Sequence, residues 1–196
     1  MSQLVALEID TDAEIQKIIQ KLDNLQDQIG SPKILKNALN STARKVRKQL
    51  IKDVPEEYSL QDKKALQDES RGGPKVLTAS AADLTATVRS RGGMQDIMAF
   101  MTKPNTKTGA AAAKVLNSSS LKPLEMDGLK AFVTTFASGH TAIVQRRGSS
   151  RLPVKKLLSP AVPHLLGNEK VREKAEAMAY ETLLSEIDKR IAKITK

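Results

Sequence analysis

Two histidines, His140 and His164, are the side chains of this chain that could act as general bases or metal ligands near neutral pH. They lie in Ser-Gly-His-Thr and Val-Pro-His-Leu, and neither has another His, Asp or Glu at the spacing of a metal site. The chain contains no cysteine, which removes disulfides and thiolate ligands from consideration. Each histidine is therefore interpreted as a structural residue or an interface contact.

Other catalytic patterns are missing from the sequence as well. The acidic pair Glu56-Glu57 stands in polar surroundings, which are typical of a solvated turn rather than of paired acid and base catalysts. Neither a Gly-Lys-Ser/Thr phosphate loop nor a Gly-x-Ser-x-Gly elbow is present. We therefore expect no enzymatic activity, no cofactor and no metal.

The charge balance indicates a polyanionic partner. Lys and Arg number 32 against 22 Asp and Glu, for a net charge of +10. Nucleic acid, a membrane surface or an acidic protein face would each suit this charge. Aromatic residues make up only 3% of the chain, which argues against stacking on single-stranded nucleic acid. Arg71-Gly72-Gly73 and Arg91-Gly92-Gly93 resemble RGG elements, but two isolated copies favour turns.

Two groups of cations are candidate contact residues. The first lies in a segment rich in Pro, Gly and Arg, and is either a solvated basic loop or an interface loop facing an acidic neighbour or a DNA-filled channel. Arg151 is its strongest candidate, because the Leu152-Pro153 backbone that follows is stiff and Arg can contact a carboxylate or phosphate with two hydrogen bonds. The candidate interface comprises Arg146, Arg147, Arg151, Leu152, Pro153, Val154, Lys155, Lys156 and Pro160.

The second group lies on a predicted helix that has seven basic and no acidic residues between positions 31 and 52. It is interpreted as a solvated helix face, with the lining of a DNA channel as the alternative. The candidate channel contacts are Arg44, Arg47 and Lys48. Contacts of this kind reach phosphates without reading bases.

Apolar periodicity predicts three helices. The first spans residues 11–29 after a Thr11/Glu14 capping box. The second begins at Ser31-Pro32 and ends at Val54-Pro55. The third follows Asn168, a favourable N-cap, and ends near residue 193.

The middle of the chain is predicted to be β-structure. Strands are expected at 75–80 and 84–90, and a hairpin at 129–136 and 141–145 around Ser138-Gly139. Residues 94–128 read as a long loop with a short helix near 110–116. The predicted fold class is α+β, a small antiparallel sheet packed by N-terminal and C-terminal helices, with a long central loop. Residues 1–30 form an N-terminal helical segment, and 31–196 form one domain with a loop insertion at 94–128.

No apolar run approaches the length of a transmembrane helix, and the N-terminus lacks the features of a signal peptide. Synthesis and assembly in the cytoplasm are therefore expected, with no membrane partner.

One run of sequence resembles the prophage minor tail protein Z family of siphophages, the tail completion proteins. It passes from Phe132 through Ser138-Gly139-His140 and a basic-Gly turn to Arg151-Leu152-Pro153-Val154. It then continues through Ser159-Pro160-Ala161-Val162-Pro163 to the C-terminal helix, and the family has a Gly where Ser159 stands. The predicted helix at 35–50 also looks like the opening segment of the family. The resemblance covers roughly residues 31–54 and 129–195.

The resemblance implies a structural virion protein in the neck, at the head-proximal end of the tail, where it prepares the tail for joining to the head. Its implied partners are a homo-hexameric ring, the tail terminator and tail tube proteins, the head-closure or connector proteins, and non-specific contact with packaged DNA. The closely related roles of tail termination and head-tail joining stay open.

Two other classes of protein compete with this reading. A basic nucleic-acid-binding protein without catalytic activity fits the charge, although the chain has neither a helix-turn-helix signal nor aromatic platforms. A nuclease would need a metal-binding carboxylate cluster, and the sequence offers none.

Overall fold

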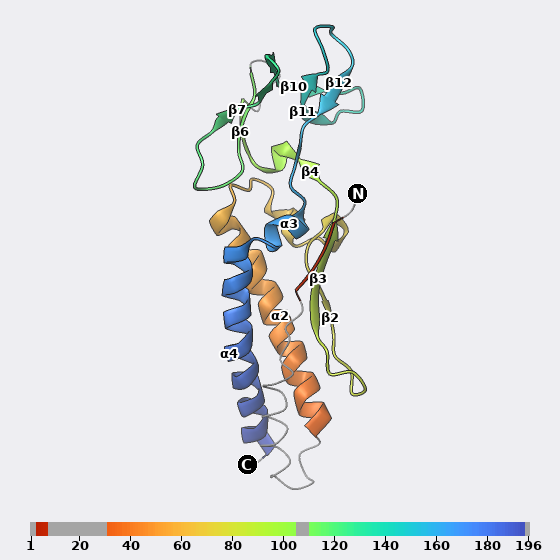
Figure 1. The fold of residues 1–196 in the computed structure, drawn as a ribbon. Helices are drawn as coiled ribbons and strands as arrows, with labels where there is room; N and C mark the ends of the chain where they lie inside the picture. Colours follow the sequence, from red (N-terminus) through yellow and green to blue (C-terminus); the bar gives the residue numbers. More distant parts are fainter. Residues whose placement is uncertain (1–2, 8–30, 105–109, 195–196) are drawn as a thin grey trace.

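The computed structural model describes residues 3–7, 31–104 and 110–194. The helix predicted at 11–29, with its capping box, lies outside these residues. Residues 3–7, within the segment assigned to an N-terminal helix, form a strand, β1 (Gln3–Leu7). In Figure 1 the molecule is elongated, with a pair of long helices at one end and small sheets at the other.

The two long helices, α2 (Ser31–Glu57) and α4 (Glu169–Ile194), run antiparallel along each other (Figure 1). Their pairing follows from the apolar stripes in the sequence. Leu35 and Ala38 of α2 pack against Leu183 and Ile187 of α4. Asn168 caps α4 as predicted, because its side-chain oxygen accepts a hydrogen bond of 3.1 Å from the Lys170 N–H.

Helix α2 passes through the position where the sequence predicted its end, and Pro55 lies inside its final turn. Proline lacks an N–H, so the carbonyl of Ile51 loses its usual partner. The loss is confined to the last turn, and the helix continues because Val54 and Tyr58 are both buried in the core. The Tyr58 N–H donates to the Val54 carbonyl at 3.0 Å.

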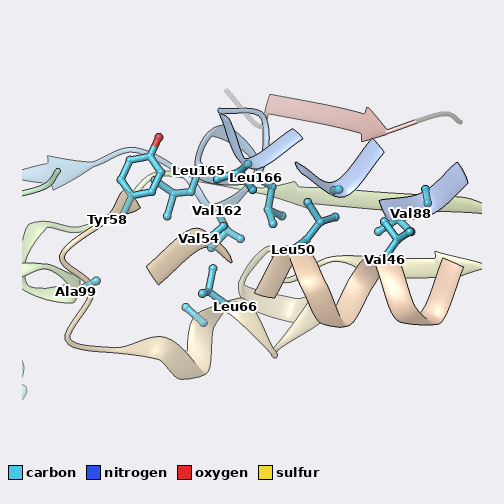
Figure 2. Packing of buried hydrophobic residues seen from close by; sticks show 14 of the residues in the cluster. Val46, Leu50, Val54, Tyr58, Leu66, Val88, Ala99, Val162, Leu165 and Leu166 are labelled. Atoms are coloured by element: carbon cyan, nitrogen blue, oxygen red, sulfur yellow. The ribbon is translucent and has the colours of Figure 1, made fainter. Parts of the chain in front are cut away.

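A three-stranded antiparallel sheet of order β1-β3-β2 stands beside α2. Its other strands are β2 (Lys75–Leu77) and β3 (Thr87–Gly92), both shorter than the predicted strands. The short helix α3 (Val162–Leu166) packs on this sheet. Figure 2 shows the resulting core, in which Val46, Leu50 and Val54 of α2 face Val88 of β3 and the side chains of α3.

The far end of the molecule is a lobe of short strands, here called the distal lobe (residues 94–160). Much of it was predicted to be a long loop, and that prediction is wrong. The segment 94–128 contains β4 (Gln95–Asp96), the 3₁₀ turn η3 (Ile97–Ala99), β5 (Met101–Lys103), β6 (Ala112–Lys114), β7 (Lys122–Pro123) and β8 (Glu125–Met126). The helix expected near 110–116 is replaced by β6. Runs of two or three residues rich in Ala and Lys carry too little alternation to reveal strands.

The predicted hairpin is confirmed. β10 (Phe132–Thr135) pairs antiparallel with β11 (Thr141–Arg146), and β12 (Val154–Lys156) extends the sheet on the other side of β11. β9 (Leu129–Lys130) pairs with β8, and β13 (Leu158–Ser159) pairs with β4. The 3₁₀ turns η1 (Lys63–Leu66) and η2 (Glu69–Arg71) link α2 to β2. The fold is α+β, as predicted, with several small antiparallel sheets rather than a single one.

Candidate interface surface

The connection between β11 and β12, residues 147–153, projects from the end of the distal lobe that is drawn at the top of Figure 1. We call these residues, together with Arg146, the tip. Its base is closed by a hydrogen bond of 3.1 Å from the Arg147 N–H to the Pro153 carbonyl. The Leu152-Pro153 peptide is cis. A Cβ atom on Gly148 would meet no atom within 4 Å, which shows how open the tip is.

The tip carries both cationic and apolar side chains. Arg146, Arg147 and Arg151 are exposed, and Leu152 exposes 68% of its surface. The Arg146 guanidinium lies 5.7 Å from the centre of the Phe132 ring, which holds that cation by a cation–π contact. Leu152 and Pro153 thus add exposed apolar surface to a basic turn.

The remaining candidate interface residues lie outside the tip, in β12 and near α3. Val154 and Lys155 are half-buried in β12, and Pro160 is half-buried near α3. Lys156 is bound within the subunit, because its ammonium lies 2.8 Å from Asp96 Oδ2 and 2.9 Å from His140 Nε2. The structure therefore brings the arginines together with Leu152 and Pro153, and sets Lys156 apart from them.

The cluster of Asp96, His140 and Lys156 was not found from the sequence. It joins three elements, since Asp96 ends β4, His140 lies in the β10–β11 turn and Lys156 ends β12. His140 Nε2 also lies 3.4 Å from Asp96 Oδ2. The Lys156 ammonium can only donate, so His140 Nε2 is the acceptor in this contact. The interpretation of His140 as a structural residue fits this geometry.

Of the candidate channel contacts, Arg44 and Lys48 are exposed on α2, while Arg47 is engaged in the fold. Its Nε donates to the Pro74 carbonyl at 2.6 Å and one terminal nitrogen donates to the Gln67 carbonyl at 3.3 Å. Arg47 thereby fastens the turns that follow α2 to the side of that helix. Arg44 and Lys48 are four residues apart on one helix face and have no such tie among the described residues.

Apolar side chains recur between residues 152 and 166, broken by three prolines, and such a series could pack inside its own subunit or against a neighbouring one. The structure buries some of its members inside the subunit and leaves others exposed. Val162, Leu165 and Leu166 are buried in the core, whereas Leu152 and Leu158 expose 68% and 50% of their surface. The second half of the series therefore builds α3 and the core, and the first half supplies exposed apolar side chains.

Beside Leu158, an open groove of about 840 Å³ is lined by the end of β3 and the two residues after it, by β13 and by α3. Its walls and floor include Gly92, Gly93, Met94, Leu158, Pro160 and Ala161. A neighbouring hollow shares Gly93 and Met94 with this groove and is lined by Asp62, Arg71 and Asp96, among others. The Arg71 guanidinium, 2.6 Å from Asp62 Oδ2, holds the pKa of that carboxyl below its usual range.

Within the described ranges, no group of three or more His, Cys, Asp or Glu is placed to hold a metal ion. In the same part of the chain, no helix combines the length and the apolar character that crossing a membrane requires. No protein-family model matches the chain, and no curated protein or solved structure is significantly similar to it.

Proposed function

We propose that this chain is a structural protein of a tailed-phage virion, acting as a tail completion protein in the neck. Two observations support this proposal: the extent of the sequence resemblance and the composition of the tip. The sequence resemblance spans residues 31–54 and 129–195, and these are the segments that form α2 and the run from β9 to α4. They pack on each other through the α2–α4 pair, so the resemblance covers one continuous body rather than two unrelated stretches.

The observation that carries the proposal is the composition of the tip. Three exposed arginines stand with Leu152 and Pro153 on a turn that projects away from the core. Arginine is enriched in protein interfaces, and an exposed apolar side chain beside it supplies the part that becomes buried. A tip of this kind suits repeated contact with neighbouring subunits of the neck. The proposed neighbours are further copies in a homo-hexameric ring, the tail terminator and tail tube proteins, and the head-closure or connector proteins.

Deletion of the gene from the producing phage or prophage tests this role. Negative-stain electron microscopy of the lysate is expected to show filled heads beside unattached tails of normal length. Overlong tails would indicate tail termination instead. Normal infectious virions would remove the structural proposal.

Complementation of that deletion tests the tip itself. We expect the double variant Arg147→Glu/Arg151→Glu to fold normally, because both side chains are exposed, and to leave heads and tails unjoined. The matched control is Lys33→Glu, which reverses an exposed charge on α2. Equal rescue of plaque formation by the double variant and the control would show that the tip makes no essential contact.

The alternative is a basic nucleic-acid-binding protein, and the charge of the distal lobe favours it. Residues 94–160 contain ten Lys and Arg against three Asp and Glu, which gives the lobe +7 of the net charge of +10. Binding of labelled duplex DNA at increasing salt separates the two readings. Tight binding with a steep loss in salt, in a phage whose deletion mutant still joins heads to tails, would favour the alternative.

A further inference from the structure

A separate pocket lies beside the main core, where the second half of α2, the strand β3 and the start of α4 meet. We call it the helix pocket, and its volume is about 400 Å³. Protein interiors leave few voids larger than a water molecule. Sites for small molecules measure about 300–1,000 Å³, and most of their lining is apolar, with a few polar groups. The helix pocket therefore has the size of a binding site rather than of a packing gap.

One part of the pocket is a wall of core side chains. Leu50 of α2, Val88 of β3 and Leu166 of α3 line it, and all three belong to the main hydrophobic cluster. Leu50 and Tyr58 both line the pocket and are eight residues apart on α2 and its end, a distance of about 12 Å at 1.5 Å per residue. An aliphatic chain lying against this wall would leave water, which is favourable.

The Tyr58 hydroxyl provides a buried hydrogen-bond donor at the pocket. Tyr58 exposes 7% of its surface, and its hydroxyl is at the end of the ring that points away from Val54 (Figure 2). Asn168 Oδ1 accepts from the Lys170 N–H, so Asn168 Nδ2 is the atom that faces Tyr58 and donates to its hydroxyl at 3.2 Å. The hydroxyl oxygen is thus an acceptor in this bond. Within the part of the chain that the structure describes, its own proton has no acceptor.

Arg172 supplies a positive charge to the same pocket from the first turns of α4. Its Nε lies 3.4 Å from Glu176 Oε1, with about half of each side chain exposed. An exposed pair at this distance is weak. The two terminal nitrogens of Arg172 make no hydrogen bond to any described residue. Among the described residues that line the pocket there is no Asp or Glu, so its polar part favours an anion.

We propose that the helix pocket binds a small monocarboxylate that carries an aliphatic chain of several carbons. The chain lies against Leu50, Val88 and Leu166, and the carboxylate accepts from the Tyr58 hydroxyl and from Arg172. A carboxylate has lone pairs for both donors, and hydrogen bonds to a charged acceptor are short and strong. The pocket belongs to the body formed by α2, β3, α3 and α4, and none of the residues of the tip lines it. The inference therefore goes beyond the proposed function and stands or falls independently of it.

Titration of octanoate into the isotopically labelled full chain tests the proposal. Amide NMR spectra are expected to show saturable binding with a dissociation constant of about 1 mM or below. The shifted amides should be those of residues 166–172 and of the segments around Leu50 and Val88. Shifts confined to the distal lobe, whose net charge attracts any anion, would overturn the proposal.

Two further compounds separate the contributions of the chain and of the charge. Acetate has the carboxylate without the chain, and octanol has the chain without the charge. Each is expected to bind at least about tenfold more weakly than octanoate. Binding of acetate as tight as that of octanoate would remove the apolar wall from the site, and equal binding of octanol would remove the carboxylate. Either result would overturn the proposal.

Two variants test the donors. Tyr58→Phe keeps the ring that packs in the core and removes the hydroxyl, and Arg172→Gln removes the charge from a half-exposed position. Each is expected to weaken octanoate binding about tenfold. The matched control is Arg44→Gln, which removes an exposed arginine of α2 outside the pocket and should leave the affinity unchanged.

Spectra recorded without octanoate show whether each variant is folded. If Tyr58→Phe does not fold, Arg172→Gln decides the test alone, because its side chain contributes no buried contact to the core. Unchanged affinity in the folded variants would overturn the proposed site. So would an equal loss of affinity in Arg44→Gln, because it would show that octanoate responds to net charge and not to the pocket.

Discussion

Gly92 approaches Gly72 so closely that a Cβ atom placed on Gly92 would lie 2.9 Å from the Cα atom of Gly72. Gly72 itself has a positive φ of 102° and ends η2. The Ser90 hydroxyl donates to the Gly72 carbonyl at 2.5 Å. The two Arg-Gly-Gly motifs are therefore brought together at one point of the fold, where Gly72 and Gly92 pack against each other. The first motif is at a turn, as predicted, whereas Arg91 and Gly92 of the second lie in strand β3.

This contact predicts that Gly92→Ala destabilises the chain by about 1–3 kcal/mol, because the added methyl group forces backbone to move. Gly93→Ala is the matched control, since its Cβ would meet no atom within 4 Å, and its free energy of unfolding should stay within about 0.5 kcal/mol of wild type. Urea denaturation followed by circular dichroism measures both. Equal stability of the two variants would contradict the close approach.

A buried carboxylate predicts how stability depends on pH. Glu186 of α4 accepts hydrogen bonds from Lys45 Nζ at 2.7 Å and from Arg190, which lowers its pKa from 4.5 to about 2. A pKa lowered by folding stabilises the native state fully above about pH 4.5, and this stabilisation is lost as the pH falls toward 2. Glu186→Gln should therefore lose about 2 kcal/mol at pH 7.

The difference between wild type and Glu186→Gln should narrow below pH 4.5 and vanish near pH 2. Glu181→Gln, at an exposed position of the same helix, should match wild type throughout. Denaturation midpoints across this pH range give the measurement. A difference in stability between wild type and Glu186→Gln that stays constant down to pH 2 would show that the charge of Glu186 does not stabilise the fold.

The cations of α2 are predicted to separate by role. Arg47→Ala should destabilise the chain by about 1–2 kcal/mol, because the carbonyls of Pro74 and Gln67 lose their donor. Arg44→Ala should change stability by less than about 0.5 kcal/mol. Thermal unfolding distinguishes the two variants. If α2 contacts DNA, it is Arg44→Ala that should reduce binding, with a shallower dependence on salt.

Asn40 holds the segment after β2 to α2 with a pair of hydrogen bonds. Its Nδ2 donates to the Ala79 carbonyl at 3.1 Å, and its Oδ1 accepts from the Ala79 N–H at 2.7 Å. Asn40→Ala leaves both backbone groups without this partner and should cost about 1–2 kcal/mol. Asn37→Ala, on an exposed position of the same helix, should cost little. Hydrogen exchange at the Ala79 amide would detect the release directly.

The long helices and the hairpin were predictable because each carries a strong local signal. Leu35, Ala38 and Val46 repeat at helical spacing, and all three are buried. The distal strands were not predictable. Ala113 is buried in a small core with Ala111 and Ala131, and alanines separated by two or eighteen residues produce no recognisable period. Their pairing is fixed by tertiary contacts, which a short run of sequence does not encode.

The candidate surface was only partly predictable, because the tip carries a local sequence signal and the groove does not. The arginines of the tip stand close together in the sequence, and their exposure follows from the Gly and Pro around them. The groove joins residues 92–94 to residues 158–161, which are more than sixty positions apart. The pairing of Leu158 with Asp96 brings them together, and a single sequence contains no sign of it.

The pairing of α2 with α4 also determines when the chain can finish folding during its synthesis. Leu35 leaves the ribosome long before Leu183 and Ile187 have been made, so its core contact has to wait on the order of ten seconds of synthesis. During that interval the apolar stripe of α2 is a site for chaperones or for aggregation. A nonsense codon after Gly167 would remove only the final helix, yet it would leave α2 permanently in that unpaired state. Such late truncations are expected to behave as null alleles.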